Sequence, residues 1–199
     1  VASVKKHTNE VTVVKSVGHA LDLIETKKYE ELMKQMHRVL IGHNRWATIG
    51  KVNKSNAHPF EFDKVVGVHN GTLSQRHNLF NQSQYDTDSE SLYSHINEHG
   101  IEDAIRNTPG AWALCWWDKE DNTINFLRNN ERPLYIAFCK NTRTIAWASE
   151  AWMIEVACAK DNIELEGDPI KLAEDTWLSY EVTDKGIVAK GRTRQVKGP

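Results

Sequence analysis

The chain has 199 residues, with 25 lysine and arginine residues against 27 aspartate and glutamate residues, and 40% of it is hydrophobic. This length and composition suit one domain with a substantial core and argue against a disordered chain or a fibre. The near balance of charge argues against the strongly basic surface typical of proteins that bind nucleic acid or anionic membranes. We therefore expect one domain over residues 1–199 whose partner is a small molecule or another protein.

The hydropathy and cysteine patterns indicate where the protein functions. No apolar run approaches the roughly 18 residues of a membrane-spanning helix, and the N-terminus has no apolar signal segment. Cys115, Cys139 and Cys158 are odd in number, far apart and without C-x-x-C spacing, which argues against disulfides and a zinc site. We expect a cytoplasmic protein with no membrane partner and with three buried, reduced thiols.

The N-terminal part predicts a strand, a helix and a second strand. Residues 11–14 (VTVV) are β-rich, and residues 28–40 carry apolar side chains at the i, i+3, i+4, i+7 spacing of an amphipathic helix. A short strand is expected at residues 39–42. Met33 and Met36 lie on the apolar stripe of the helix, so we expect them to fill the core rather than bind a metal.

The middle of the chain alternates between loop, strand and helix. Residues 43–56 are polar and predict a long loop of the kind that usually has a function. Residues 64–69 predict a strand that ends in a turn at Asn70–Gly71. Thr87 to Glu90 has the S/T-x-x-E form of a capping box at the start of a helix, and a shorter helix is expected at residues 101–107.

The C-terminal half predicts antiparallel hairpins. Strands are expected at residues 111–117, 123–127, 133–139 and 144–148, then a helix at 150–160 and a last hairpin from 177–183 and 187–192. Helices that are grouped apart from hairpins predict an α+β layered domain. Few basic residues lie among the six tryptophans of this half, so we expect core packing rather than base stacking from Trp112, Trp116, Trp117, Trp147, Trp152 and Trp177.

Four short segments contain the polar groups that could carry chemistry. They are GHNRWATIG at 42–50, NAHPF at 56–60, VHNGT at 68–72 and DTDSE at 86–90. Taken singly, each fits an ordinary role, such as a turn at an Asn-Gly pair or a first-turn acid favoured by the helix dipole. In this order and spacing they resemble the class II (N-terminal-nucleophile) glutamine amidotransferases, and so do RPLYI at 132–136 and ASE at 148–150.

The resemblance implies both a fold and a reaction. The fold is an Ntn-hydrolase-like four-layer αββα sandwich of two antiparallel sheets, which agrees with the hairpins predicted above. The reaction is hydrolysis of the side-chain amide of L-glutamine to glutamate and ammonia, without a cofactor. In the family the ammonia normally passes to a synthase domain, so an ammonia-accepting synthase is an expected partner.

Residue roles follow from the resemblance. Arg45 would bind the α-carboxylate of glutamine through its planar fork, and Asp88 would bind the α-ammonium, so both should face one pocket. The side-chain amide of Asn70 and the backbone N–H of Gly71 would form the oxyanion hole. His69 is also expected to bind the substrate.

The resemblance also implies a mobile loop that closes over the substrate. Residues 46–53 would fold over bound glutamine, with Gly50 as a hinge. Trp46 and Thr48 are expected to contact the substrate from this loop. Ile49 stands where many members of the family have histidine.

The resemblance further implies a nucleophile that residues 1–199 do not contain. Members begin with Cys-Gly-Ile, whose thiol attacks and whose α-amine acts as the base, whereas this sequence begins with Val1 and its first residues resemble the second strand of the family. We expect the cysteine to come from a removed segment or a second polypeptide, and we expect residues 1–199 alone to be inactive.

Two other readings of the same residues stay open. One is a degenerate amidotransferase that binds glutamine or a partner, or has a structural role, without catalysis. The other is a metal hydrolase that uses His43, His58 and His69 with Asp86 and Asp88. The spacing of these residues is irregular and lacks H-x-x-x-H, so we expect no metal.

Overall fold

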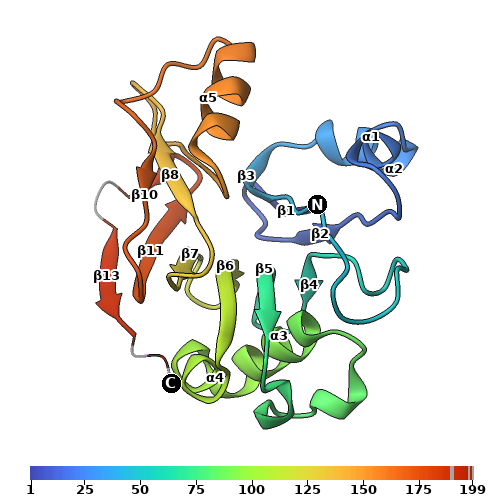
Figure 1. The fold of residues 1–199 in the computed structure, drawn as a ribbon. Helices are drawn as coiled ribbons and strands as arrows, with labels where there is room; N and C mark the ends of the chain where they lie inside the picture. Colours follow the sequence, from blue (N-terminus) through green and yellow to red (C-terminus); the bar gives the residue numbers. More distant parts are fainter. Residues whose placement is uncertain (189–190, 197, 199) are drawn as a thin grey trace.

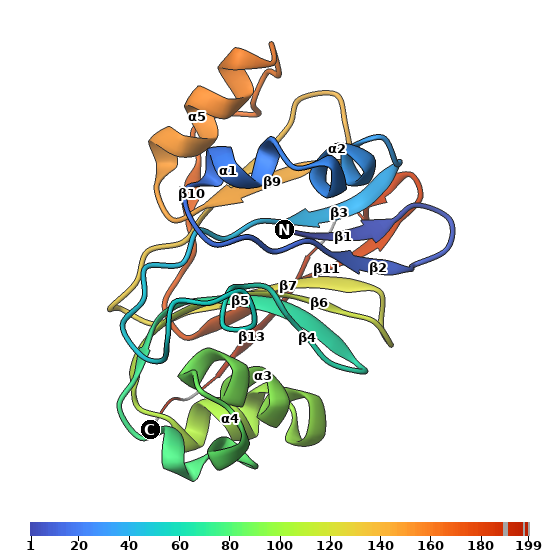
Figure 2. The same ribbon diagram turned by 90° about the vertical axis from the view of Figure 1, so that its right-hand side faces the viewer.

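The computed structural model describes residues 1–188, 191–196 and 198, and these form four layers (Figure 2). Two layers of antiparallel strands face each other, and helices cover both outer surfaces. This is the αββα sandwich that the sequence predicted. None of the described helices is long and apolar enough to cross a membrane.

One layer is a seven-stranded sheet in which all pairs are antiparallel. Its strands follow the order β12-β11-β7-β6-β5-β4, with β13 also paired to β11. The longest pairing joins β5 to β6, from Val65 opposite Asp118 to Leu73 opposite Gly110. The strands are β4 (Phe60–Glu61), β5 (Val65–Leu73), β6 (Gly110–Asp118), β7 (Thr123–Arg128), β11 (Thr176–Thr183), β12 (Gly186–Ile187) and β13 (Arg192–Gln195).

The second layer consists of two separate three-stranded sheets. One has the order β2-β1-β3 and the other β10-β8-β9, and they lie beside each other over the seven-stranded sheet (Figures 1 and 2). Their strands are β1 (Ala2–Lys5), β2 (Val11–Val13), β3 (His37–Ile41), β8 (Tyr135–Phe138), β9 (Ile145–Ala148) and β10 (Ile170–Lys171).

Helices cover the outer surface of each sheet layer (Figure 2). The two three-stranded sheets carry α1 (Ala20–Ile24), α2 (Lys27–Met33) and α5 (Ala151–Lys160), and the seven-stranded sheet carries α3 (Asp88–His99) and α4 (Ile101–Asn107). Two 3-10 turns, η1 (Arg76–Asn78) and η2 (Gln82–Gln84), precede α3. The Thr87 side chain caps α3 by accepting from the Glu90 backbone N–H at 3.2 Å, which is the N-cap half of the predicted capping box.

Alternation along the strands divides the core into two main parts. Neighbouring residues of a strand face opposite sides of the sheet, so Trp117 packs between the two sheet layers and Trp116 packs against the helices. Helix α3 lies very close to β5, because the Tyr93 hydroxyl donates to the Val68 carbonyl at 2.6 Å and the Tyr93 ring occupies the space where a side chain on Gly67 would lie. This packing fixes the middle of α3 against β5.

The predicted helix at residues 28–40 is too long. It ends at Met33, and β3 begins at His37 because His37 to Ile41 pair with β1, a partner that helical periodicity cannot reveal. Met33 and Met36 are 41% and 61% exposed, so the prediction that they fill the core was wrong.

Two further predictions are corrected. Asn70–Gly71 is not a turn, because both residues pair with β6 and β5 continues to Leu73. Trp152 is 58% exposed on α5, whereas Trp112, Trp116 and Trp117 are fully buried as expected. The last predicted hairpin is present as β11 and β12, and part of its second arm, residues 189–190, lies outside the described residues.

Candidate active site

The end of β5 places Asn70 and Gly71 at the edge of the space between the two sheet layers. Val66 and Val68 pack into the core between the layers, so strand alternation directs the Asn70 side chain to the same side. Gly71 has φ +153°, and a Cβ built on it would lie only 1.8 Å from the Ala111 carbonyl oxygen. Only glycine fits at this position, which explains the second half of the Asn-Gly pair.

His69 faces the opposite side of β5 and bonds entirely to protein. Its Nε2 lies 3.3 Å from the Ala111 carbonyl oxygen and its Nδ1 lies 3.0 Å from the Ser89 hydroxyl. A carbonyl only accepts, so Nε2 donates to Ala111 and Nδ1 accepts from Ser89. Burial lowers the pKa of His69, which agrees with a neutral ring. His69 therefore ties β5 to α3 and β6, and this leaves neither ring nitrogen for a substrate.

Asp88 is the first residue of α3 and is almost fully buried. One carboxylate oxygen accepts from the Leu73 backbone N–H at 2.9 Å and the other accepts from the Ser89 N–H at 3.0 Å. The position at a helix N-terminus favours the negative charge. Asp88 therefore joins the start of α3 to the end of β5, two residues beyond Gly71.

The polar loop that follows β3 crosses this same region. The Thr48 hydroxyl lies 3.2 Å from the Thr72 hydroxyl of β5. Gly50 has φ +81°, and a Cβ there would lie 2.9 Å from the Asp86 carbonyl oxygen. The Trp46 side chain is 90% exposed. The loop thus contacts the end of β5 and the start of α3 while Trp46 projects into solvent.

Arg45 lies at the base of this loop. Its guanidinium donates to the Ile49 carbonyl, and its positive charge contributes to lowering the pKa values of His43 and His58. Among the described residues, no hydrogen bond or ion pair joins Arg45 to Asp88. That both residues face one pocket therefore stays a prediction.

Two neighbouring histidine rings, half-buried His43 and buried His58, contact each other. The rings of His43 and His58 lie 4.2 Å apart between centroids, and the Phe60 ring packs against His58. Burial, with smaller effects from nearby positive groups, lowers the pKa of His43 to about 4 and that of His58 well below its ordinary value. Both rings are therefore neutral. No group of three or more His, Cys, Asp or Glu side chains within the described residues could hold a metal ion.

No role was predicted for Asn56, although it begins the NAHPF segment. It is buried, and its side-chain amide donates to the Lys51 carbonyl at 3.0 Å and to the Asp86 carboxylate at 3.4 Å. Its backbone N–H donates to the Asn53 side chain at 2.8 Å. Asn56 thus closes the loop and links it to the residues just before α3.

Known proteins resemble most of this chain in sequence. Residues 4–190 match the family model described as a glutamine amidotransferase domain. The chain belongs to this glutamine amidotransferase family. It is 32% identical to a glutamine–fructose-6-phosphate aminotransferase of Listeria monocytogenes over an alignment of 210 residues, which covers 91% of this chain and 34% of that protein. The corresponding protein of Listeria innocua is also 32% identical, over 68% of this chain and 25% of its own length.

Solved structures support the fold of this amidotransferase domain. The glutamine phosphoribosylpyrophosphate amidotransferase of B. subtilis has a TM-score of 0.71 at 19% identity, over 98% of this chain and 42% of that one. A structure of the allosteric regulatory enzyme of purine biosynthesis has a TM-score of 0.70 at 17% identity, over the same shares. The chain therefore spans a quarter to two fifths of the length of these relatives.

The cysteines of this amidotransferase chain do not reach the site in a reactive form. Cys115 lies on β6 opposite Val68, Cys139 follows β8, and Cys158 lies on α5; all three are buried and free. Burial raises the pKa of Cys115 and of Cys139. A buried thiol of raised pKa is a poor nucleophile. Cys115 and Cys139 therefore fit the structural role that the sequence predicted for them.

Proposed function

We propose that this domain binds L-glutamine and hydrolyses its side-chain amide to glutamate and ammonia, with a cysteine outside residues 1–199 as nucleophile. The observation that carries the proposal is the end of β5, where Asn70 turns toward the space between the sheets and Gly71 has no room for a side chain. Membership of the glutamine amidotransferase family supports it. The ammonia would pass to a synthase, for which the names of the longer relatives provide the precedent.

The substrate would lie across the end of β5 and under the loop. Arg45 would release the Ile49 carbonyl and turn its guanidinium to the α-carboxylate of glutamine. Asp88 retains acceptor capacity beyond its two backbone bonds, because a carboxylate has about four lone-pair sites, and it would accept from the α-ammonium. Trp46 and Thr48 would close over the bound molecule.

The chemistry assigns one role to each group. The thiolate forms a bond to the amide carbon of the side chain, and the carbonyl oxygen becomes an oxyanion that accepts from the Asn70 amide and the Gly71 N–H. Collapse of this intermediate breaks the C–N bond. The nitrogen leaves as ammonia with the proton that the α-amine of the nucleophilic cysteine took from its thiol. Water then hydrolyses the thioester to glutamate and restores the thiol.

A second function is glutamine binding without hydrolysis. The specific observation that favours it is the burial of Cys115, Cys139 and Cys158, which leaves residues 1–199 without an accessible thiol. Both functions require the same binding residues, and they differ in whether ammonia is released once a cysteine-led segment is present.

Titration calorimetry of residues 1–199 with L-glutamine tests the binding that both functions share. We expect Arg45→Lys to weaken binding roughly 10- to 100-fold, because an ammonium cannot replace the two parallel hydrogen bonds of a guanidinium to a carboxylate. The matched control is Arg106→Lys, an exposed arginine in the last turn of α4, which should leave the affinity unchanged. Equal affinities for wild type and Arg45→Lys would contradict the proposed role of Arg45.

A further inference from the structure

A pocket lies at one edge of the sandwich, where the two sheet layers end side by side. Strand β2 is an end strand of its three-stranded sheet, β4 is an end strand of the seven-stranded sheet, and the two lie opposite each other (Figures 1 and 2). The pocket has a volume of about 360 Å³, which is the size of a site for a small molecule. Residues that follow β2, β4 itself, α2 and the first turn of α3 all contribute to its lining.

Lys15 is the central charged residue of this pocket. Its side chain is half-buried, and its ammonium lies 4.7 Å from the centre of the Phe60 ring and donates to the Ser55 carbonyl at 3.3 Å. An ammonium has three N–H donors, so two of them have no acceptor among the described residues. Burial lowers the pKa of Lys15, although the charges of Glu90 and Glu61 act in the opposite direction. The Lys15 ammonium is therefore partly desolvated, and a bound anion would stabilise it.

The other charged groups leave the pocket with an excess of positive charge. Lys28 of α2 and Lys54 of the loop after β3 also line it, and none of the three lysines forms an ion pair within the part of the chain that the structure describes. Glu61 is paired with Lys119 at 2.9 Å, whereas the Glu90 carboxylate has no cation within bonding distance among these residues. Three ammonium groups and one unpaired carboxylate give a net charge of +2.

This charge and the remaining lining favour one class of ligand. A phosphate monoester carries about −1.5 to −2 at pH 7 and so matches the pocket, whereas a carboxylate carries a single charge. Glu90 would repel a second anionic group but can accept from a hydroxyl. Val14, Pro59 and Phe60 form an apolar side that suits the carbon atoms of a ligand. The pocket therefore favours a small hydroxylated molecule with one phosphate.

We propose that this pocket binds a phosphate monoester of a small hydroxylated molecule, with the phosphate among Lys15, Lys28 and Lys54 and a ligand hydroxyl at the Glu90 carboxylate. No residue that we assign to glutamine binding lines the pocket, so the site is a second one. It depends neither on the nucleophilic cysteine nor on the proposed reaction, and residues 1–199 suffice to test it.

Isothermal titration of residues 1–199 with glycerol 3-phosphate tests the site. We expect a Kd below about 1 mM at low salt, where screening of the charges is weak. Lys15→Gln should raise this Kd roughly tenfold or more, because a partly desolvated charge-assisted contact is lost. The double variant Lys28→Gln, Lys54→Gln changes only exposed side chains, so it should fold normally and raise the Kd roughly three- to tenfold.

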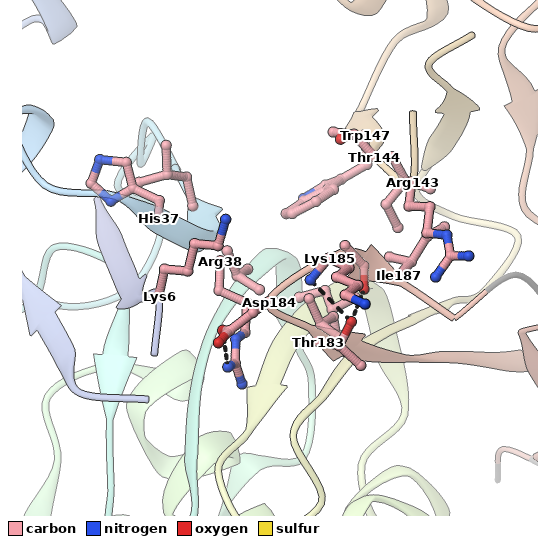
Figure 3. Close-up of a pocket in the computed structure, with 16 residues that line it drawn as sticks. Lys6, His37, Arg38, Arg143, Thr144, Trp147, Thr183, Asp184, Lys185 and Ile187 are labelled. Carbon is pink, nitrogen blue, oxygen red and sulfur yellow. Dashed lines mark hydrogen bonds and ion pairs between the residues drawn. The ribbon is translucent and has the colours of Figure 1, made fainter. Parts of the chain in front are cut away.

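The matched control removes the same charge from another hollow of the protein. Lys6 lines a separate groove of about 700 Å³ between β3 and β9, which Figure 3 shows, and Lys6→Gln should leave the Kd unchanged. Equal losses of affinity in Lys6→Gln and Lys15→Gln would overturn the site, because they would show diffuse attraction to a positive surface. Absence of binding up to about 10 mM glycerol 3-phosphate would overturn it as well.

Two further ligands test the chemical class. Glycerol should not bind, and inorganic phosphate should bind more weakly than the ester, because it lacks the glycerol hydroxyls and carbon atoms. Glu90→Ala should remove this preference for the ester, since the acceptor for the ligand hydroxyl is lost. Equal affinities of the wild-type chain for inorganic phosphate and glycerol 3-phosphate, or a preference that persists in Glu90→Ala, would contradict the proposed ligand class.

Discussion

At the residue scale, Gly71 is the position where the backbone itself sets the chemistry. A Cβ there would meet the Ala111 carbonyl at 1.8 Å, whereas a Cβ on Gly100, at φ +82°, would meet nothing within 4 Å. We expect Gly71→Ala to lower the free energy of unfolding by about 2–4 kcal/mol, because β5 and β6 must separate, and Gly100→Ala to lower it by about 1 kcal/mol through backbone strain alone. Urea denaturation measures both, and equal losses would contradict the close approach at Gly71.

The lowered histidine pKa values give a second prediction at this scale. The pKa of His43 is lowered from 6.5 to about 4, so between these values the unfolded chain binds a proton that the folded chain excludes. The free energy of unfolding should therefore fall as the pH drops from about 6.5 to 4. We expect His43→Gln to reduce this slope, with the remainder from His58 and His69, and His77→Gln, at an exposed position, to leave it unchanged. Thermal unfolding across this range provides the measurement, and an undiminished slope in His43→Gln would contradict it.

At the scale of elements, the cap of α3 links stability to the site. Thr87 accepts from the Glu90 N–H, and Thr26 accepts from the Tyr29 N–H in the same way at the start of α2, both at 3.2 Å. Each change to alanine should cost about 1 kcal/mol of stability. Only Thr87→Ala should also weaken glutamine binding, because only α3 begins with Asp88. Calorimetry of both variants tests this, and an equal effect on binding would contradict a role for the α3 start.

The elements also show which parts of the fold could be predicted from the sequence. The capping box, the helix at 101–107 and the hairpins were predicted because their signals are local. The helix that was extended to Leu40 and the turn assigned to Asn70–Gly71 were wrong, because β1 and β6, both distant in sequence, fix these segments as strands. The contact between the His43 and His58 rings could not be predicted from the sequence, because it joins two loop segments that meet only in the folded structure.

At the scale of the whole molecule, the fold brings together three parts of the chain that are distant in sequence. The loop after β3 contacts the end of β5 through Thr48 and Thr72, and the start of α3 contacts it through the Asp88 carboxylate and the Leu73 N–H. In the proposed function these three parts supply substrate binding and the oxyanion hole. Because the thiols within residues 1–199 are buried, we expect this chain alone to release no ammonia from glutamine.

The most direct test of the proposed function is release of labelled ammonia from glutamine carrying ¹⁵N in its side-chain amide. We expect none from residues 1–199 alone and continuous, thiol-dependent release after addition of a segment that begins with Cys-Gly-Ile, as members of the family do. In that active form, Asn70→Ala should lower turnover by roughly 10²–10³-fold with little change in glutamine affinity, because the oxyanion forms only during reaction. Release from residues 1–199 that survives loss of all three cysteines, or undiminished turnover in Asn70→Ala, would contradict the account.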